Sequence, residues 1–242
     1  MPVSQSHTEP LQPTANRLTE VPDHRIVPAP WRLAGSGLII VTRPDSSDPS
    51  LHRFTQDELR PHALAGLSVT MFVDYWRSDA GPYRELLFIP CRFRIGGARR
   101  WSISRIFVST PESVVGGRAN WGIPKQIAAF EVEGAAGGRQ SVTVSRDDGL
   151  VAALEFEPVG PEIPVTTALL PSRLLRLAQY RDGKTFEFAP AARGRMRLAR
   201  LLAADSDPQA FPLPGSGRVL GAFSVTSFEM QFPASRVIKG LP

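Results

Sequence analysis

The chain has 242 residues, 42% of them hydrophobic, with 28 basic and 23 acidic residues and a net charge of +5. This composition can bury one large core or two small ones, and because all-β folds of this size are commonly one domain, we expect one. The positive charge invites a nucleic-acid partner, but the arginines are scattered, and the densest group, at 193–200, alternates with small and apolar residues. Nucleic-acid binding is therefore not expected.

The N-terminal segment, residues 1–27, contains proline, threonine and serine with little hydrophobic periodicity, which predicts a flexible arm. We place a single domain at residues 28–242. Within it, the first expected elements are a strand at 37–42 and a loop at 45–50. A short helix at 55–60 follows, because Thr55 and Glu58 have the spacing of a capping box.

Alternating apolar and polar residues then predict a series of strands. Asp147-Asp148-Gly149 and Arg181-Asp182-Gly183 are hairpin signals, and further helices are expected at 171–180 and 195–204. The predicted fold is mainly β with few short helices, an antiparallel sheet whose closure into a barrel would remove exposed edges. The expected strands after residue 60 are 67–76, 83–95, 101–109, 125–133, 140–146, 150–157, 185–189 and 218–232.

Cysteine and histidine give no sign of a metal site. Cys91 is the only cysteine, and the four histidines lie before the core strands without metal-ligand spacing. The first residues lack the apolar region of a signal peptide, and no apolar run reaches the length of a membrane span. We expect a cytoplasmic protein with no metal, no cofactor and no membrane partner.

Lysine is rare in this chain, and one lysine stands in an unusual place. Lys125, Lys184 and Lys239 are the only three lysines among the basic residues. Lys125 follows Gly122 and Pro124, which predict a stiff turn, and precedes a half-buried strand. Unlike arginine, a lysine can lose its proton and attack a carbonyl. A strand-end lysine with no chemical role remains an alternative from the count alone.

The string GRANWGIPK at 117–125 resembles the G-R-E-x-x-G-x-P-K signature of the acetoacetate decarboxylase superfamily. Tyr83-Arg84-Glu85 is similar to the Y-x-E that this family carries on an upstream strand. With the Pro28–Leu33 entry and Leu170-Pro171, the resemblance extends over most of residues 28–235. It implies a β-cone fold and a Schiff base between Lys125 and a keto acid.

Three positions depart from the family pattern. Gln126 replaces a second lysine that is thought to lower the pKa of the Schiff-base lysine, and Ala119 replaces a glutamate. The substrate-side arginine of the family falls near Ser36, with Arg32 close enough to substitute. Desolvation alone can lower the pKa of a buried lysine by several units. We therefore predict that Lys125 lies in an apolar cavity and titrates below the ordinary lysine value.

The predicted function is that of a Schiff-base lyase acting on a small keto acid, by decarboxylation or by aldolase or dehydratase chemistry, with Lys125 as nucleophile. Glu85 is expected to position the substrate or shuttle protons, although a salt bridge between strands would also explain it. The expected substrate-binding residues are Arg118, Arg32, Tyr83 and Trp121; Arg118 has the alternative of bracing the lysine loop.

Two alternatives remain open from the sequence. The first is a non-catalytic member that binds a small carbonyl compound in the same pocket, which Gln126, Ala119 and Ser36 favour. The second is a structural partner in a biosynthetic complex. Under each of these functions we expect a homo-oligomer.

Overall fold

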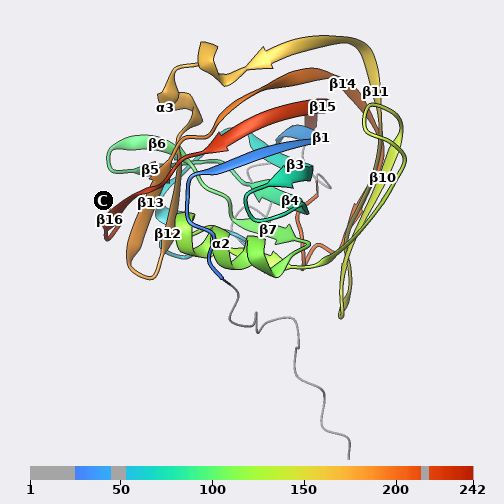
Figure 1. Ribbon diagram of the computed structural model, residues 1–242. Helices are drawn as coiled ribbons and strands as arrows, with labels where there is room; N and C mark the ends of the chain where they lie inside the picture. Colours follow the sequence, from blue (N-terminus) through green and yellow to red (C-terminus); the bar gives the residue numbers. More distant parts are fainter. Residues whose placement is uncertain (1–24, 45–52, 214–217, 242) are drawn as a thin grey trace, which may run out of the picture.

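The computed structural model describes residues 25–44, 53–213 and 218–241. Most of these residues form strands, which are arranged in two sheets (Figure 1). The larger sheet has ten strands. Neighbouring strands run antiparallel except β7 and β8, which are parallel. In spatial order the strands are β8 (Lys125–Ile127), β7 (Arg105–Val108), β4 (Tyr83–Ile89), β3 (Ser68–Ser78), β1 (Trp31–Arg43), β15 (Arg218–Phe232), β14 (Ala191–Ser206), β11 (Gly149–Thr166), β10 (Gln140–Arg146) and β9 (Ala129–Glu133).

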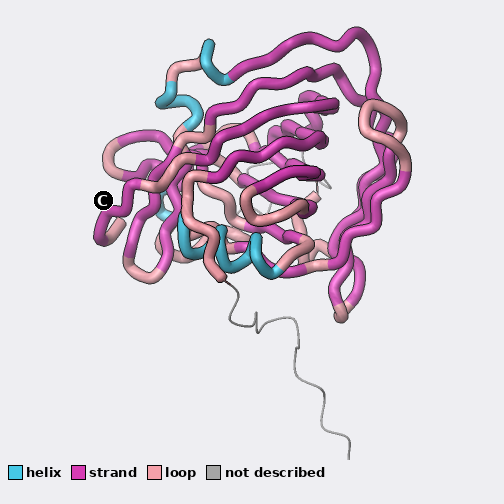
Figure 2. Tube along the Cα trace, viewed as in Figure 1, coloured by secondary structure: helices cyan, strands magenta, loops and turns pink. Residues whose placement is uncertain are grey.

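The ten-stranded sheet curls into a nearly closed barrel. Its two end strands, β8 and β9, are separated in the sequence by Ala128 alone. The Ala128 N–H donates to the carbonyl of Val108 at 3.0 Å, which holds the joint against β7. Figure 2 shows the strands following one another around the barrel. The predicted, mostly antiparallel barrel is confirmed.

A second sheet of six strands lies beside the barrel, where the C-terminal end of the chain is drawn in Figure 1. Its order is β16 (Arg236–Lys239), β13 (Lys184–Phe188), β12 (Leu177–Arg181), β6 (Ala98–Trp101), β5 (Arg92–Ile95) and β2 (Ala63–Leu64). β12 pairs with β6 in parallel through Leu177 and Trp101, and the other pairs are antiparallel.

Strand β4 is buried on both faces, because alternate side chains enter different clusters. Leu86 and Phe88 join a cluster with Phe107 on one face. Tyr83 and Leu87 face the other way, into a cluster that helix α2 (Pro111–Trp121) covers with Val114 and Trp121. This second face, between sheet and helix, is where Lys125 lies.

Helix α2 was not expected, and three expected helices differ from the structure. Residues 195–204 belong to β14, whose pairing with β11 and β15 overrides the helix propensity of its Arg, Ala and Leu residues. The helix predicted at 171–180 is only α3 (Ser172–Leu175), and β12 follows it. The helix predicted at 55–60 is a turn followed by the 3-10 helix η1 (Arg60–His62). Most of the predicted arm and the loop at 45–50 lie outside the described residues.

Strands β10 and β15 have the predicted bounds, and both predicted hairpins form. In the β12–β13 hairpin, Asp182 and Gly183 have φ values of 50° and 71°. Two consecutive residues with positive φ are what a tight hairpin turn of this handedness requires.

No helix among the described residues is long and apolar enough to cross a membrane. The same part of the chain contains no group of three or more His, Cys, Asp or Glu residues that could hold a metal ion.

Candidate active site

The end of α2 fixes the position of Lys125. Gly122 has a φ of 65°, and its N–H donates to the carbonyl of Arg118 at 3.0 Å. The N–H of Ile123 donates to the carbonyl of Gly117 at 3.3 Å. This pair of bonds closes the helix in the way that a left-handed glycine allows. The chain then enters β8 at Lys125, whose exposed fraction is 3%.

Two adjacent glycines of α2 let the helix lie against the lysine. A Cβ on Gly117 would be 2.6 Å from Cδ of Lys125, and a Cβ on Gly116 would be 2.4 Å from the ring of Trp31. Both distances are shorter than non-bonded carbon atoms tolerate. The stem of Lys125 and the indole of Trp31 therefore occupy space that any larger helix residue would take.

The amine of Lys125 has a partner for each of its three N–H groups. Nζ lies 2.8 Å from Oε2 of Glu85, 2.9 Å from Oγ of Ser113 and 3.3 Å from the hydroxyl of Tyr83. A lysine ammonium has three donors and no acceptor, so this set of oxygens matches the charged form. Nζ also lies 4.8 Å from the ring centroid of Tyr83 and 6.0 Å from that of Trp31.

The charges of Lys125 and Glu85 oppose the prediction of a lowered pKa for Lys125. Burial lowers the pKa of Lys125, but the negative charge of Glu85 and the hydrogen bonds to Glu85 and Tyr83 raise it, and the net direction is upward. The predicted burial is confirmed, but the amine contacts three oxygens where an apolar lining was predicted, and the predicted pKa below the ordinary value is wrong. Desolvation acts as expected, but the same enclosure brings a carboxylate to hydrogen-bond distance. The resting site is therefore an ammonium–carboxylate pair.

Two tyrosines complete the charged centre. Burial raises the pKa of Tyr83 to about 12, although the nearby Lys125 lowers it. Burial also raises the pKa of Tyr75 well above its usual range, and the negative charge of Glu85 adds to this. The two rings lie 4.7 Å apart. Both phenols are thus protonated at neutral pH, and Tyr75 shares a hydrogen bond with Glu85.

The other predicted site residues lie further from the amine. Nε of Arg118 donates to the backbone carbonyl of Lys125 at 2.9 Å, which is the loop-bracing arrangement. Trp121 packs edge-on against Trp31 at 4.9 Å and donates through Nε1 to a backbone carbonyl. Arg32 is exposed and follows the inward Trp31 on β1, so its side chain leaves the opposite face.

The three departures from the family pattern also have clear positions. Ala119 is on the exposed side of α2. Gln126 is the next residue of β8 after Lys125, so its side chain points to the opposite face of the strand. Ser36 is buried on β1, opposite Asp74 of β3.

Sequence reasoning missed Ser113 and the contacts of Trp31 and Tyr75 with this centre. Ser113 lies in the first turn of a helix that was not predicted. Trp31 and Tyr75 were seen only as strand residues, because their proximity to the lysine depends on the register of β1, β3 and β4. The one signal in the sequence was the alternation of apolar and polar residues along β3, which puts Tyr75 on the same strand face as the apolar Val73.

Fold and site together define a β-barrel protein built around a buried lysine–glutamate pair. The chain belongs to the acetoacetate decarboxylase (ADC) family, whose model matches residues 18–210. No curated protein matches it by sequence.

Solved structures with the same fold are distant in sequence. An acetoacetate decarboxylase-like enzyme from Sphingomonas wittichii RW1 superposes with a TM-score of 0.64 at 14% identity, over 89% of this chain and 95% of the other. The enduracididine biosynthesis enzyme MppR complexed with pyruvate gives 0.61 at 16% identity, over 89% and 93%. Acetoacetate decarboxylase from Legionella pneumophila subsp. pneumophila str. Philadelphia 1 gives 0.57 at 13% identity, over 96% and 98%.

Proposed function

We propose that the protein is a lyase that forms a Schiff base between Lys125 and the carbonyl carbon of a small keto acid. The observation that carries the proposal is the contact of 2.8 Å between Nζ of Lys125 and Oε2 of Glu85, with both side chains buried. A nucleophilic amine needs a proton acceptor within hydrogen-bond reach, and Glu85 provides one. Family membership and the pyruvate bound to the similar MppR support the substrate class.

The reaction begins with transfer of a proton from the ammonium of Lys125 to Glu85, which leaves a neutral amine. The nitrogen bonds to the carbonyl carbon while its proton passes to the carbonyl oxygen, giving a carbinolamine. The acid of Glu85 then protonates the hydroxyl group, which departs as water, and the iminium forms. In a β-keto acid the C–C bond to the carboxylate breaks next, and its electron pair moves toward the iminium, releasing CO₂ and leaving an enamine.

The charge of the centre is the same before and after imine formation. An ammonium faces the carboxylate of Glu85 at the start, and an iminium faces it at the end. A buried carboxylate left without a cationic partner is strongly destabilising. Glu85 keeps such a partner in both states, so the protein is not required to solvate an isolated charge.

Borohydride trapping tests the proposal directly. The protein is incubated with pyruvate or acetoacetate and borohydride, and the intact mass and the labelled peptide are measured. We expect one adduct at Lys125 that Lys125→Arg abolishes, because arginine keeps the charge but not the nucleophilicity. Lys184→Arg is the matched control, since Lys184 is exposed on β13. Equal labelling of the Lys125→Arg protein would end the assignment.

The upward pKa of Lys125 favours a second candidate. In it, the ammonium stays protonated and holds a carbonyl compound by hydrogen bonding without turnover. Reversible binding of pyruvate with no trapped adduct at any pH up to about 11 would select this function over the lyase.

A further inference from the structure

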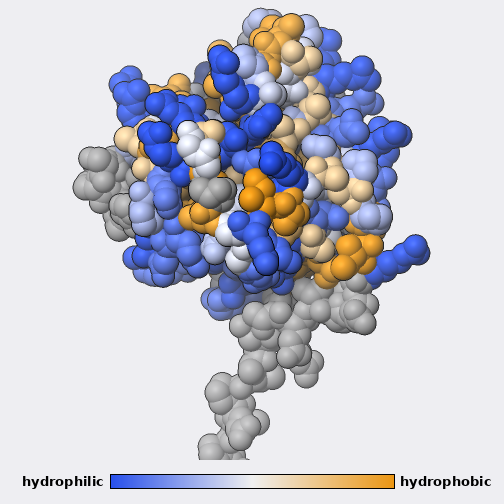
Figure 3. Space-filling view, turned by 90° about the vertical axis from the view of Figure 1, so that its left-hand side faces the viewer, coloured by the Kyte–Doolittle hydropathy of each residue, from blue (hydrophilic) through white to orange (hydrophobic). Residues whose placement is uncertain are grey.

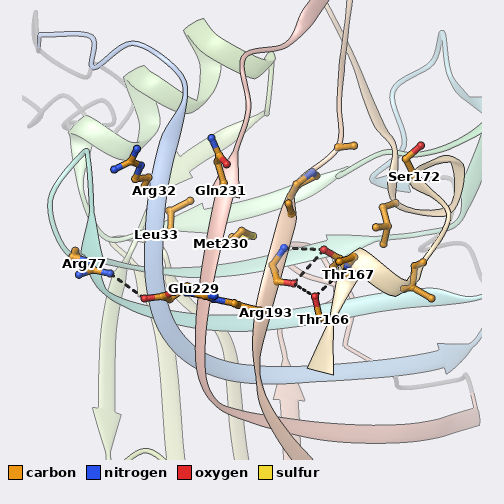
Figure 4. A pocket seen from close by; sticks show the side chains of 17 residues that line it. Arg32, Leu33, Arg77, Thr166, Thr167, Ser172, Arg193, Glu229, Met230 and Gln231 are labelled. Carbon is orange, nitrogen blue, oxygen red and sulfur yellow. Dashed lines mark hydrogen bonds and ion pairs between the residues drawn. The ribbon is translucent and has the colours of Figure 1, made fainter. Parts of the chain in front are cut away.

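A groove of about 620 Å³ opens on the surface between β1, β15, β14 and α3 (Figure 4). Its lining combines apolar side chains with polar and charged ones, and the catalytic candidates Lys125 and Glu85 are absent from it. The charged lining residues are Arg32, Arg77, Arg193 and Glu229. This volume lies within the range of sites for small organic ligands and is far larger than pyruvate needs. The apolar lining residues include Leu33, Leu170, Leu175, Pro190 and Met230.

The floor of the groove is continuous with the wall of the lysine site. Leu33 and Met230 are register partners on β1 and β15, and both belong to the core that contains Trp31, Tyr75 and Tyr83. Leu33 is two residues beyond Trp31 on the same strand face, a step of about 7 Å. One row of side chains therefore separates the groove from the residues that touch the amine.

A second line of contacts leads from the amine to the groove along β15. The ring of Tyr83, beside Nζ of Lys125, lies 4.7 Å from Tyr75, and Tyr75 lies 5.8 Å edge-on from Phe228. Phe228 is only half-buried, and Met230 follows it on the same face. Aromatic and apolar side chains thus fill the space between the amine and the groove.

The walls of the groove are anchored, which indicates a preformed site. Glu229 bridges β15 to β14 through Arg193 at 2.7 Å and to β3 through Arg77 at 3.7 Å (Figure 4). On the far side, the indole N–H of Trp101 donates to the carbonyl of Leu174 in α3 at 2.9 Å. Hydrogen bonds between the hydroxyl of Thr167 and the backbone of Ala192 hold the segment around Thr167 against β14.

The surface above these walls is also partly apolar. Figure 3 shows the side of the molecule to which α3 belongs in Figure 1, with patches of hydrophobic side chains among hydrophilic ones. Leu169, Leu170 and Leu174, next to the groove, are 84%, 49% and 44% exposed.

We infer that this groove binds the distal apolar part of the substrate, so that the preferred substrate is a keto acid with an unbranched chain of about six carbons or more. The inference rests on the proposed Schiff-base function and adds the substrate class. The carbonyl end reaches Lys125 when the side chains of the Leu33–Met230 floor move aside, and the apolar chain stays in the groove. A two-carbon or three-carbon acid would leave the groove empty and gain nothing from it.

Competition between a long and a short keto acid tests the inference. The rate of borohydride-trapped adduct is measured with 2-oxooctanoate and with pyruvate, in the native protein and in Met230→Trp, which fills the groove. We expect 2-oxooctanoate to react at least tenfold faster than pyruvate at equal low concentration, equivalent to about 1.4 kcal/mol. Met230→Trp should bring this ratio close to one. Leu198→Trp, at a leucine 57% exposed on β14 outside the groove, is the control and should leave it unchanged.

Ala189→Phe, from the loop after β13 that lines the groove, replaces Met230→Trp if that protein does not fold. Calorimetric binding of 2-oxooctanoate to the Lys125→Arg protein separates the two hypotheses. If groove-filling substitutions weaken this binding and the native protein forms no adduct, the groove proposal is supported and the Schiff-base proposal is overturned. If both acids form adducts at equal rates and groove filling changes neither rate, the Schiff base is supported and the groove proposal is overturned. Absence of any binding of 2-oxooctanoate to the Lys125→Arg protein also overturns the groove proposal.

Discussion

The substitution Glu85→Gln should reverse the direction in which the protein shifts the pKa of Lys125. Two unit charges at the Nζ–Oε2 distance of 2.8 Å attract by about 6 kcal/mol at an effective dielectric constant of about 20. Desolvation of a buried ion costs a comparable several kcal/mol. In the native protein the attraction exceeds this cost, and the pKa of Lys125 is raised. Glutamine keeps the size and an acceptor oxygen but removes the charge, so desolvation acts unopposed and the pKa should fall below its ordinary value.

The three lysines make this measurement simple, because selective ¹³Cε labelling gives three signals and Lys125→Arg identifies one of them. We expect that signal to titrate above about 10.4 in the native protein and below it in Glu85→Gln. Glu187→Gln is the control, since Glu187 forms another largely buried ion pair, with Arg100 at 3.0 Å. A pKa in Glu85→Gln within about one unit of the native value would refute the reasoning, because it would assign less than about 1.4 kcal/mol to the pair.

The same upward shift has a consequence for stability. A group whose pKa is higher in the folded than in the unfolded state stabilises the fold fully below the unfolded value. The stabilisation by the Lys125–Glu85 pair is therefore present up to about pH 10 and is lost as the pH rises through the folded-state pKa of Lys125. Urea denaturation at a series of alkaline pH values should show this loss, and Glu85→Gln should remove it.

Three further substitutions have definite expected outcomes. Gly117→Ala should slow adduct formation at least tenfold, because the new methyl group displaces the stem of Lys125. Folding should be retained, because alanine favours a helix over glycine by about 1 kcal/mol. Mass spectrometry of the trapped protein measures the rate and circular dichroism checks the fold, with Gly138→Ala as the control. Gln126→Lys should leave the titration of Lys125 within about one unit, because the new ammonium points to the other strand face. Asn120→Ala should lower the free energy of unfolding by about 1–3 kcal/mol in urea denaturation, because its amide bonds the backbone of residues 27 and 29; an unchanged midpoint would contradict this.

The centre of the site was predictable because its signals are local. Lys125 follows a glycine–proline turn, and Tyr83 and Glu85 are two residues apart on one strand, so the resemblance to the family's motifs singled out Lys125 and Glu85. Helix α2 was hidden by its packed face, which contains Ser113 and two glycines in place of large apolar residues. Its end signals were nevertheless readable, with proline in the first turn and glycine after the last residue.

The pKa of the lysine was not predictable from the same signals. An apolar sequence around Lys125 indicates burial, but the sign of the shift depends on whether a carboxylate lies a few ångströms away. That distance is set by the pairing of β4 with β7 and of β7 with β8. Sequence spacing places the two residues on different strands and gives no register for the strands between them.

The place of β15 in the sheet constrains when the amine can be enclosed during synthesis. β15 lies between β1 and β14, so it joins an arc made from residues 31–127 to one made from residues 129–206. Until β15 leaves the ribosome, each arc has an open edge, and Trp31 lacks its register partner Phe232. The sheet around Lys125 is thus completed only when residues 218–232 are available, and a nascent chain stalled before residue 218 would hold the amine of Lys125 in an unclosed, aggregation-prone half-barrel.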